Sequence, residues 1–190
     1  MKIDPRDAAA VSAEPAILVG VRTRGSRMDF EDPLGELRDL AETAGARVVG
    51  ELLQNREAPN GRTYLGKGKV EELVAMVGEL GARVVIFDNE LSPSQIQALE
   101  EEAKVKVIDR SELILDIFAN RATTREAQLQ VEIAQLEYTA PRLRAMWSHL
   151  GQVTGGAPVG VGTRGPGEQQ LEIDRRLVSR RLVALTRELE

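Results

Sequence analysis

The sequence predicts an α/β protein in which a small, four-stranded, mostly parallel sheet with helices is followed by a long antiparallel two-helix hairpin. Between residues 16 and about 120, short apolar runs alternate with helix-length amphipathic segments, an order typical of parallel strands joined by helical crossovers. The word Gly-Ala-Arg-Val-Val occurs at 45–49 and again at 81–85, one helix-plus-strand unit later. From residue 123 onward, apolar residues instead recur at alternating spacings of four and three, which indicates coiled-coil seams.

The α/β part is expected to cover residues 16–121, after a flexible tail at 1–15 that has no apolar period. Four apolar runs of strand length are expected to form the sheet, at residues 16–21, 46–53, 82–88 and 105–109. Amphipathic segments between them predict helices at 34–45, 68–81 and 92–103.

Capping residues support the starts of two of these helices. Asp32 and Pro33 fit the cap and the first position of the first helix. Ser92 and Gln95 have capping-box spacing, with Pro93 at the first helical position between them.

Residues 122–190 are expected to form the hairpin, with a glycine-rich tip loop at 151–167. Thr123 and Glu126 have capping-box spacing at its start. The first seam then runs through Leu129, Ile133, Leu136, Ala140, Leu143, Trp147 and Leu150, and the second through Leu171, Val178, Leu182, Leu185 and Leu189. Pro141 is expected to kink the first arm. Because the second seam reaches almost to Glu190, the helix is expected to continue in a longer protein.

Composition narrows the class of protein. The chain has 190 residues, no cysteine and one histidine, which excludes disulfides and thiolate metal sites and leaves no metal site expected. No run approaches the ~20 apolar residues of a membrane span, and no signal pattern begins the chain, so a soluble cytoplasmic protein is expected. The net charge is −5, but residues 142–190 carry eight basic groups, all arginine, against five acidic ones. Arginine suits phosphate contact, but from composition alone the favoured interpretation is that these arginines form ion pairs on a helix surface.

The segment GRTYLGKG, residues 61–68, matches the phosphate-loop pattern G-x-x-x-x-G-K-[ST] in seven of eight places. It fails at Gly68, where the hydroxyl that binds magnesium should stand. Gly66, Lys67 and Gly68 are therefore a weak candidate phosphate site at a helix start. A flexible turn that opens the next helix is the favoured reading.

The other side chains that could take part in catalysis do not form a recognisable catalytic site in the sequence, so no catalytic residue is expected. Asp88 and Asp109 end predicted strands, where open α/β sheets place ligands, but aspartate is also a helix cap, and Glu112 follows Asp109 at capping distance. His149 has no nucleophile or carboxylate at a suggestive spacing, and Trp147 lies on the seam.

Four segments together resemble the N-terminal region of the HflX-type GTPases. They are TYLGKGKVEEL (63–73), IFDNELSPSQ (86–95), VIDRSELILDIFANRATTREAQLQVEIAQLEYTAPRL (107–143) and GTRGPGEQQLEIDRRLV (162–178). The resemblance implies a ribosome-associated GTPase that binds the large ribosomal subunit and its rRNA and helps to split or rescue ribosomes. It also implies a G domain, with GTP and Mg²⁺, that the present sequence does not include; no cofactor is expected in these 190 residues.

The resemblance implies RNA contacts by two groups of hairpin residues, the glycine-rich tip and the arginines of the second arm. The tip is interpreted either as a connector or as an RNA contact. RNA contact is possible because glycines allow the backbone to approach RNA closely and Arg164 can pair with or stack on RNA. The resemblance favours contact. The expected RNA-binding residues are Gly155, Gly156, Gly160, Gly162, Arg164, Gly165, Arg175, Arg176, Arg180 and Arg181.

Two other functions stay open from the residues alone. One is an independent nucleotide-binding enzyme that uses residues 61–68 and the strand-end aspartates. The other is a protein-interaction module whose hairpin pairs with another coiled coil. The G domain of the full-length protein is an expected partner of the chain in the HflX-type interpretation.

Overall fold

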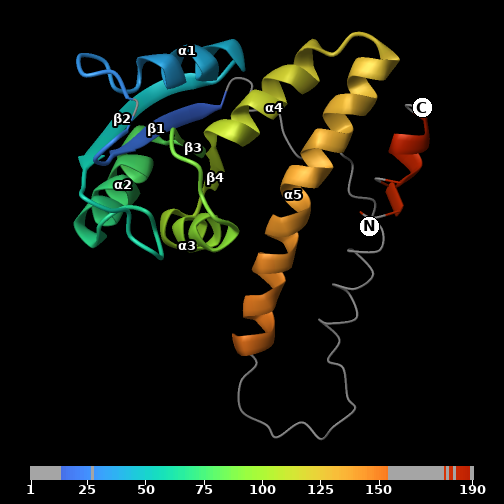
Figure 1. The fold of residues 1–190 in the computed structure, drawn as a ribbon. Coiled ribbons are helices and arrows are strands. Elements are labelled where there is room, and N and C mark those ends of the chain that lie inside the picture. Colours follow the sequence, from blue (N-terminus) through green and yellow to red (C-terminus); the bar gives the residue numbers. More distant parts are fainter. Residues whose placement is uncertain (1–13, 27, 154–177, 179, 182, 189–190) are drawn as a thin grey trace, which may run out of the picture. The chain divides into compact units, whose positions relative to one another are not determined.

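The computed structural model describes residues 14–26, 28–153, 178, 180–181 and 183–188 (Figure 1). The chain divides into two compact units, residues 1–121 and 122–190. Most of the expected N-terminal tail, the glycine-rich tip from residue 154 onward, Arg175 and Arg176 lie outside the described residues.

The first unit is built on one sheet of four strands. They are β1 (Pro15–Arg22), β2 (Arg47–Asn55), β3 (Val84–Phe87) and β4 (Lys106–Asp109). Their order is β2-β1-β3-β4, and all three neighbouring pairs are parallel. The predicted α/β fold with a four-stranded sheet is therefore confirmed, and the sheet is fully parallel.

Helices cover both faces of this sheet (Figure 1). The helices α1 (Gly35–Thr43) and α4 (Arg110–Arg121) pack on one face, where Leu37 and Leu113 are fully buried. The helices α2 (Lys67–Leu80) and α3 (Pro93–Ala103) pack on the other, where Leu73 and Leu99 are fully buried. Two apolar layers therefore sandwich the strands, which explains why β1 and β3 read as continuous apolar runs rather than as alternating ones.

The repeated pentapeptide has a structural role at both sites. Gly45 and Gly81 have φ angles of 89° and 60°, the left-handed region that glycine adopts without steric cost. Each follows a helix and leads into a strand of the sheet. The fourth residues of the two words, Val48 and Val84, pair with the same residue, Ala16, from opposite sides. The repeat therefore marks two equivalent helix-to-strand turns that flank β1.

The helix starts agree with the sequence at α3 and differ at α1. Ser92 and Gln95 form the complete capping box at α3. At the other helix, the expected cap is wrong: α1 begins at Gly35, two residues later than predicted from Pro33, and has no side-chain cap. The carboxylate of Asp32 instead receives the guanidinium of Arg38 at 2.9 Å.

The second unit contains the 29-residue helix α5 (Arg125–Val153) and a helical segment near the C-terminus, of which residues 178, 180–181 and 183–188 are described. The expected cap at Thr123 is wrong by one residue, because the Oγ1 atom of Thr124 accepts the amide of Ala127 at 3.2 Å. The helix continues through Pro141.

Two ion pairs define an antiparallel register between these helices. Arg125 donates from Nε to Glu188 at 3.0 Å, and Arg181 donates from Nε to Glu132 at 2.8 Å. Seven residues forward along α5 correspond to seven residues backward along the C-terminal segment. Between the two pairs, the seam residues Leu129 and Leu185 are 3% and 0% exposed. The described part of the hairpin thus has apolar contacts at its centre and ion pairs beside them.

Within the described residues, no helix is both long enough and apolar enough to cross a membrane.

Candidate functional site

The carboxyl ends of β1, β3 and β4 surround a cavity of about 640 Å³. From β1 the chain passes to β2 on one side and then returns to β3 on the other, so the crevice lies where the strand connections change direction. Open α/β sheets bind ligands at such a position. The loop between β1 and α1 forms one wall, and residues that follow β3 and β4 form the other; the charged and amide side chains are Asp29, Asp32, Glu36, Asp88, Asn89 and Arg110.

Arg110 holds the inner wall of this cavity together. Its Nη1 atom lies 3.0 Å from Oδ1 of Asp88, and its Nη2 atom lies 2.6 Å from Oε1 of Glu36. The hydrogen bond from Arg110 lowers the pKa of Glu36, and the bonds to Glu36 and Asp88 raise the pKa of Arg110. Glu36 and Arg110 are therefore charged at neutral pH. The ion pairs of Arg110 join α1, the end of β3 and the start of α4.

Asp109, the other aspartate at a strand end, has the capping role that the sequence suggested. Its Oδ1 atom accepts the amide of Glu112 at 3.0 Å, and its Oδ2 atom accepts the amide of Leu91 at 3.3 Å. The side chain is fully buried. Asp109 therefore stabilises the start of α4, whereas Asp88 faces the cavity.

Asn89 extends the sheet by one pair of hydrogen bonds. Its Oδ1 atom accepts the amide of Val21 at 2.7 Å, and its Nδ2 atom donates to the carbonyl of Val21 at 3.0 Å. The side-chain amide thus forms the pair of hydrogen bonds that the backbone of a neighbouring strand would form, and it fixes the end of β1. The loop that follows begins from a rigid position.

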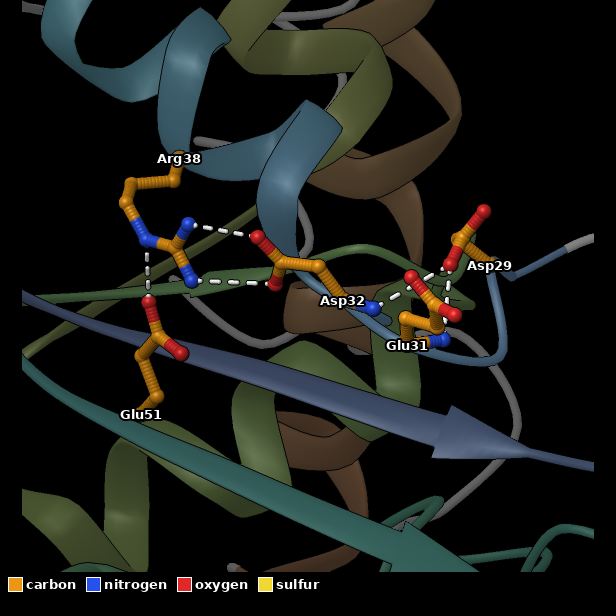
Figure 2. A network of polar contacts seen from close by, with 5 residues as sticks. All are labelled: Asp29, Glu31, Asp32, Arg38 and Glu51. Carbon is orange, nitrogen blue, oxygen red and sulfur yellow. Dashed lines mark hydrogen bonds and ion pairs between the residues drawn. The ribbon is translucent and has the colours of Figure 1, made fainter.

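A second network fixes the outer wall (Figure 2). Arg38 on α1 binds both carboxylate oxygens of Asp32, at 2.9 and 3.1 Å, and reaches Oε1 of Glu51 on β2 at 2.7 Å. The Oδ1 atom of Asp29 accepts the amides of Glu31 and Asp32, at 2.7 and 3.1 Å. These bonds lower the pKa of Asp29 and that of Asp32, so both carboxylates are ionised at neutral pH.

The charge of the cavity indicates what it can accept. Its described lining contains four carboxylates and one guanidinium, and that guanidinium is already shared between two of the carboxylates. This arrangement repels phosphate groups. Among the described residues, no cluster of three or more histidine, cysteine or carboxylate side chains is placed to hold a metal ion. The sequence identified Asp88 by its place at a strand end, but the partners come from separate segments and no local pattern reveals them.

The loop that resembles a phosphate loop has its amides engaged internally. The amides of Arg62 and Thr63 donate to Oδ1 of Asn60, at 2.8 and 3.2 Å. Tyr64 donates to the Asn60 carbonyl, and Leu65 donates to Thr63. The fifth amide in succession, that of Gly66, donates to Oε1 of Gln54 at 2.9 Å. A phosphate cradle requires these groups to point at the ligand, and here they close a turn.

The remaining candidate phosphate residues stand at the start of α2. Gly66 is the cap residue, and Lys67 and Gly68 are the first two residues of the helix. A Cβ atom added at Gly68 would meet no atom within 4 Å outside its own stretch of helix. Phosphate binding by these three residues stays a prediction, now limited to the helix start.

The predicted RNA-binding arginines divide in the structure. Arg180 and Arg181 are both exposed, and Arg181 forms an ion pair with Glu132. The other predicted RNA-binding residues, including Arg164, Arg175 and Arg176, lie outside the described part of the chain. RNA binding by the whole group stays a prediction.

The α/β unit and the helical unit that follows it match the N-terminal and middle regions of a class of GTP-binding proteins. The family described as "GTP-binding GTPase N-terminal" matches residues 31–119, and "GTP-binding GTPase Middle Region" matches residues 121–190. The chain belongs to the HflX family of GTPases and corresponds to its N-terminal and middle regions.

Curated relatives support this assignment. The chain is 49% identical over 177 residues to GTPase HflX of Alkalihalophilus pseudofirmus, covering 93% of this chain and 41% of that protein. It is 44% identical over 179 residues to GTPase HflX of Escherichia coli, covering 94% of this chain and 41% of that protein. The chain therefore spans about two fifths of the length of the relatives it matches.

Two solved structures share the fold. One is described as SsGBP in complex with GDP, with a TM-score of 0.64 and 21% identity, covering 93% of this chain and 43% of that one. The other is a GTP-binding protein from Sulfolobus solfataricus in complex with GDP, with a TM-score of 0.61 and 21% identity, covering 93% of this chain and 44% of that one. At this identity the likeness supports the architecture.

Proposed function

We propose that this chain is the ribosome-recognition part of an HflX-type GTPase. In this role the α/β unit and the helical hairpin bind the large ribosomal subunit through its rRNA in the cytoplasm, and so help to split or rescue ribosomes. Membership of the HflX family over both units is the observation that carries the proposal. GTP and Mg²⁺ belong to a G domain that is both the catalytic part and a partner of these residues.

The charge distribution supports an RNA contact through the hairpin. The last 49 residues carry eight arginines and no lysine, whereas the rest of the chain is acidic overall. Arginine binds phosphate through two parallel hydrogen bonds and stacks on bases, so it serves both backbone and base contacts. The exposed Arg180 belongs to this set.

The α/β unit supports binding rather than catalysis. Its cavity is lined mainly by carboxylates that already have partners, and its glycine-lysine loop uses five successive amides internally. Neither arrangement favours an independent nucleotide-hydrolysing enzyme. The unit instead presents a rigid surface on which loops are held in place.

Sedimentation with purified ribosomal subunits tests the proposal. The chain should co-sediment with the large subunit and remain in the supernatant with the small subunit. Equal recovery with both subunits, or recovery with neither, would contradict the proposed function. A hairpin that serves protein pairing would instead show self-association in analytical ultracentrifugation without ribosomes.

A further inference from the structure

The cavity at the carboxyl ends of β1, β3 and β4 has hydrogen-bond acceptors left over after its internal contacts are made. Asp88 and Glu36 each bind Arg110 through one carboxylate oxygen. One oxygen of Asp29 accepts two backbone amides. Within the described part of the chain, no hydrogen bond reaches the second oxygen of any of these three carboxylates. Acceptors without a donor therefore line the cavity from three segments: the end of β3, α1 and the loop before α1.

The size and walls of the cavity suit an elongated organic molecule. Its volume of about 640 Å³ lies in the range of small-molecule sites and is far larger than a metal ion. The side chain of Asp88 is 14% exposed and that of Glu36 is 78% exposed, so the acceptors lie at different depths. Met28 and Pro33 add apolar surface to the lining. A ligand with an aliphatic chain and separated polar groups would fit these walls.

The charge of the lining selects a cation. The lining has four carboxylates and one guanidinium, and Arg38 outside it binds only Asp32 among the four. Hydrogen bonds from Arg110 and from backbone amides lower the pKa of Glu36 and that of Asp29, so both are charged at neutral pH. A cleft lined by one sign of charge concentrates ligands of the opposite sign.

We propose that this cavity binds an aliphatic amine that carries two or more ammonium groups. An ammonium group has only donors, which matches carboxylate oxygens that lack a donor. The alkyl chain between the ammonium groups would lie against Met28 and Pro33. A free polyamine and a lysine-rich segment of another protein both have this chemistry. The proposal goes beyond ribosome recognition and does not depend on it.

Isothermal titration calorimetry of the whole chain with spermidine tests the site. Spermidine should bind at one site per chain, and an uncharged diol of similar length should not bind. Binding should weaken as sodium chloride is added, because the attraction is electrostatic. Magnesium chloride at the same ionic strength should weaken it no further. Displacement of spermidine by one Mg²⁺ per chain would overturn the proposal in favour of a metal site.

Two substitutions remove charge from the cavity with little structural change. Glu36→Gln should weaken spermidine binding about fivefold, because one largely exposed charged acceptor is lost. Asp29→Asn should have a similar effect, while its Oδ1 atom can still accept the amides of Glu31 and Asp32. Equal thermal unfolding of the variants and the wild type would show that the fold is kept.

The matched control is Glu42→Gln, which changes the net charge by the same amount. Glu42 is exposed on α1, the helix that also carries Glu36, and is not part of the cavity lining. Its substitution should leave spermidine binding unchanged. If Glu42→Gln and Glu36→Gln weakened binding equally, the amine would be attracted to the acidic surface as a whole, and the proposed site would be wrong.

A peptide of alternating lysine and glycine distinguishes the two sources of the amine. Binding of spermidine alone, with the expected loss in Glu36→Gln, would support a free polyamine as the ligand. Binding of the peptide alone, with the same loss, would support a lysine-rich protein segment. Binding of neither probe would overturn the proposal and leave the proposed ribosome recognition standing.

Discussion

The Nη2 atom of Arg181 lies 2.7 Å from the Oε1 atom of Glu132, across the two helices of the hairpin. This ion pair gives a structural role to one of the arginines predicted to bind RNA. Arg180 and Arg181 are both exposed, and of the two only Arg181 has an ion pair within the described residues, so we expect the adjacent arginines to serve different purposes. The periodicity of the sequence placed Arg180 and Arg181 on the second arm of the hairpin. Only the register between the two helices shows which of these arginines lies opposite a carboxylate of α5.

Single substitutions of these two arginines should therefore have different effects. Arg181→Gln should lower the free energy of unfolding by about 0.5 kcal/mol, because the pair is largely exposed to solvent. Arg180→Gln should leave stability unchanged and weaken binding to large subunits. Urea unfolding and subunit sedimentation of both variants measure the two effects. The reverse pattern, with Arg181→Gln losing affinity and Arg180→Gln losing stability, would contradict this division.

Asp116 on α4 should make stability depend on pH. Its side chain is 8% exposed, its Oδ2 atom has no hydrogen-bond partner, and burial raises its pKa to about 6. A raised pKa means that the folded state favours the protonated carboxyl. The contribution of Asp116 to the free energy of unfolding is therefore present at pH 4 and is lost as pH rises through 6.

Asp116→Asn removes this titration while keeping the size of the side chain. Relative to wild type, the variant should gain on the order of 2 kcal/mol in unfolding free energy between about pH 4 and pH 7.5. Urea unfolding of both proteins at each pH measures the difference, and other carboxylates cancel in the comparison. Parallel stability curves for the two proteins would show that Asp116 is ionised without cost.

Completing the phosphate-loop pattern should not create a nucleotide-hydrolysing site. Gly68→Ser supplies the missing hydroxyl, and open space at Gly68 admits the side chain. Nevertheless, the amides of residues 62–66 are engaged within the loop. We expect no GTP or ATP turnover by wild type or by Gly68→Ser in a phosphate-release assay. Turnover that survives purification and disappears in Lys67→Ala would refute this prediction.

The glycine-rich tip is expected to matter for function more than for folding. Replacing residues 155–165 with a short glycine-serine turn should change stability only slightly, because the seams and ion pairs close the hairpin without it. In a full-length protein, the same change should retain GTP binding but lose much of the activity on ribosomes, and Arg164→Ala should cause a milder loss. Full ribosome splitting by the shortened protein would make the tip a passive connector.

Local patterns predicted much of the fold. Apolar runs of strand length, the capping box at Ser92 and the glycine-led repeats at 45–49 and 81–85 each depend on neighbours in sequence, and the structure contains all of them. The expected caps at α1 and α5 were wrong. At α5 the neighbouring Thr124 takes the place of Thr123, and at α1 no side chain caps the helix because the carboxylate of Asp32 is bound by Arg38.

The candidate sites were harder to predict because they depend on distant segments. Arg110 meets Glu36 and Asp88 only after three elements converge at the sheet edge, and no spacing in the sequence signals that.

The dependence of large-subunit binding on salt tests the central claim most directly. If this chain recognises rRNA through arginines and phosphates, the logarithm of its affinity should fall linearly and steeply with the logarithm of salt concentration between about 50 and 200 mM. Arg180→Gln should reduce that slope by about one phosphate contact, whereas the acidic-surface control Glu79→Gln should not. An affinity that stays constant across the salt series, or no binding to the large subunit at any salt concentration, would contradict the account.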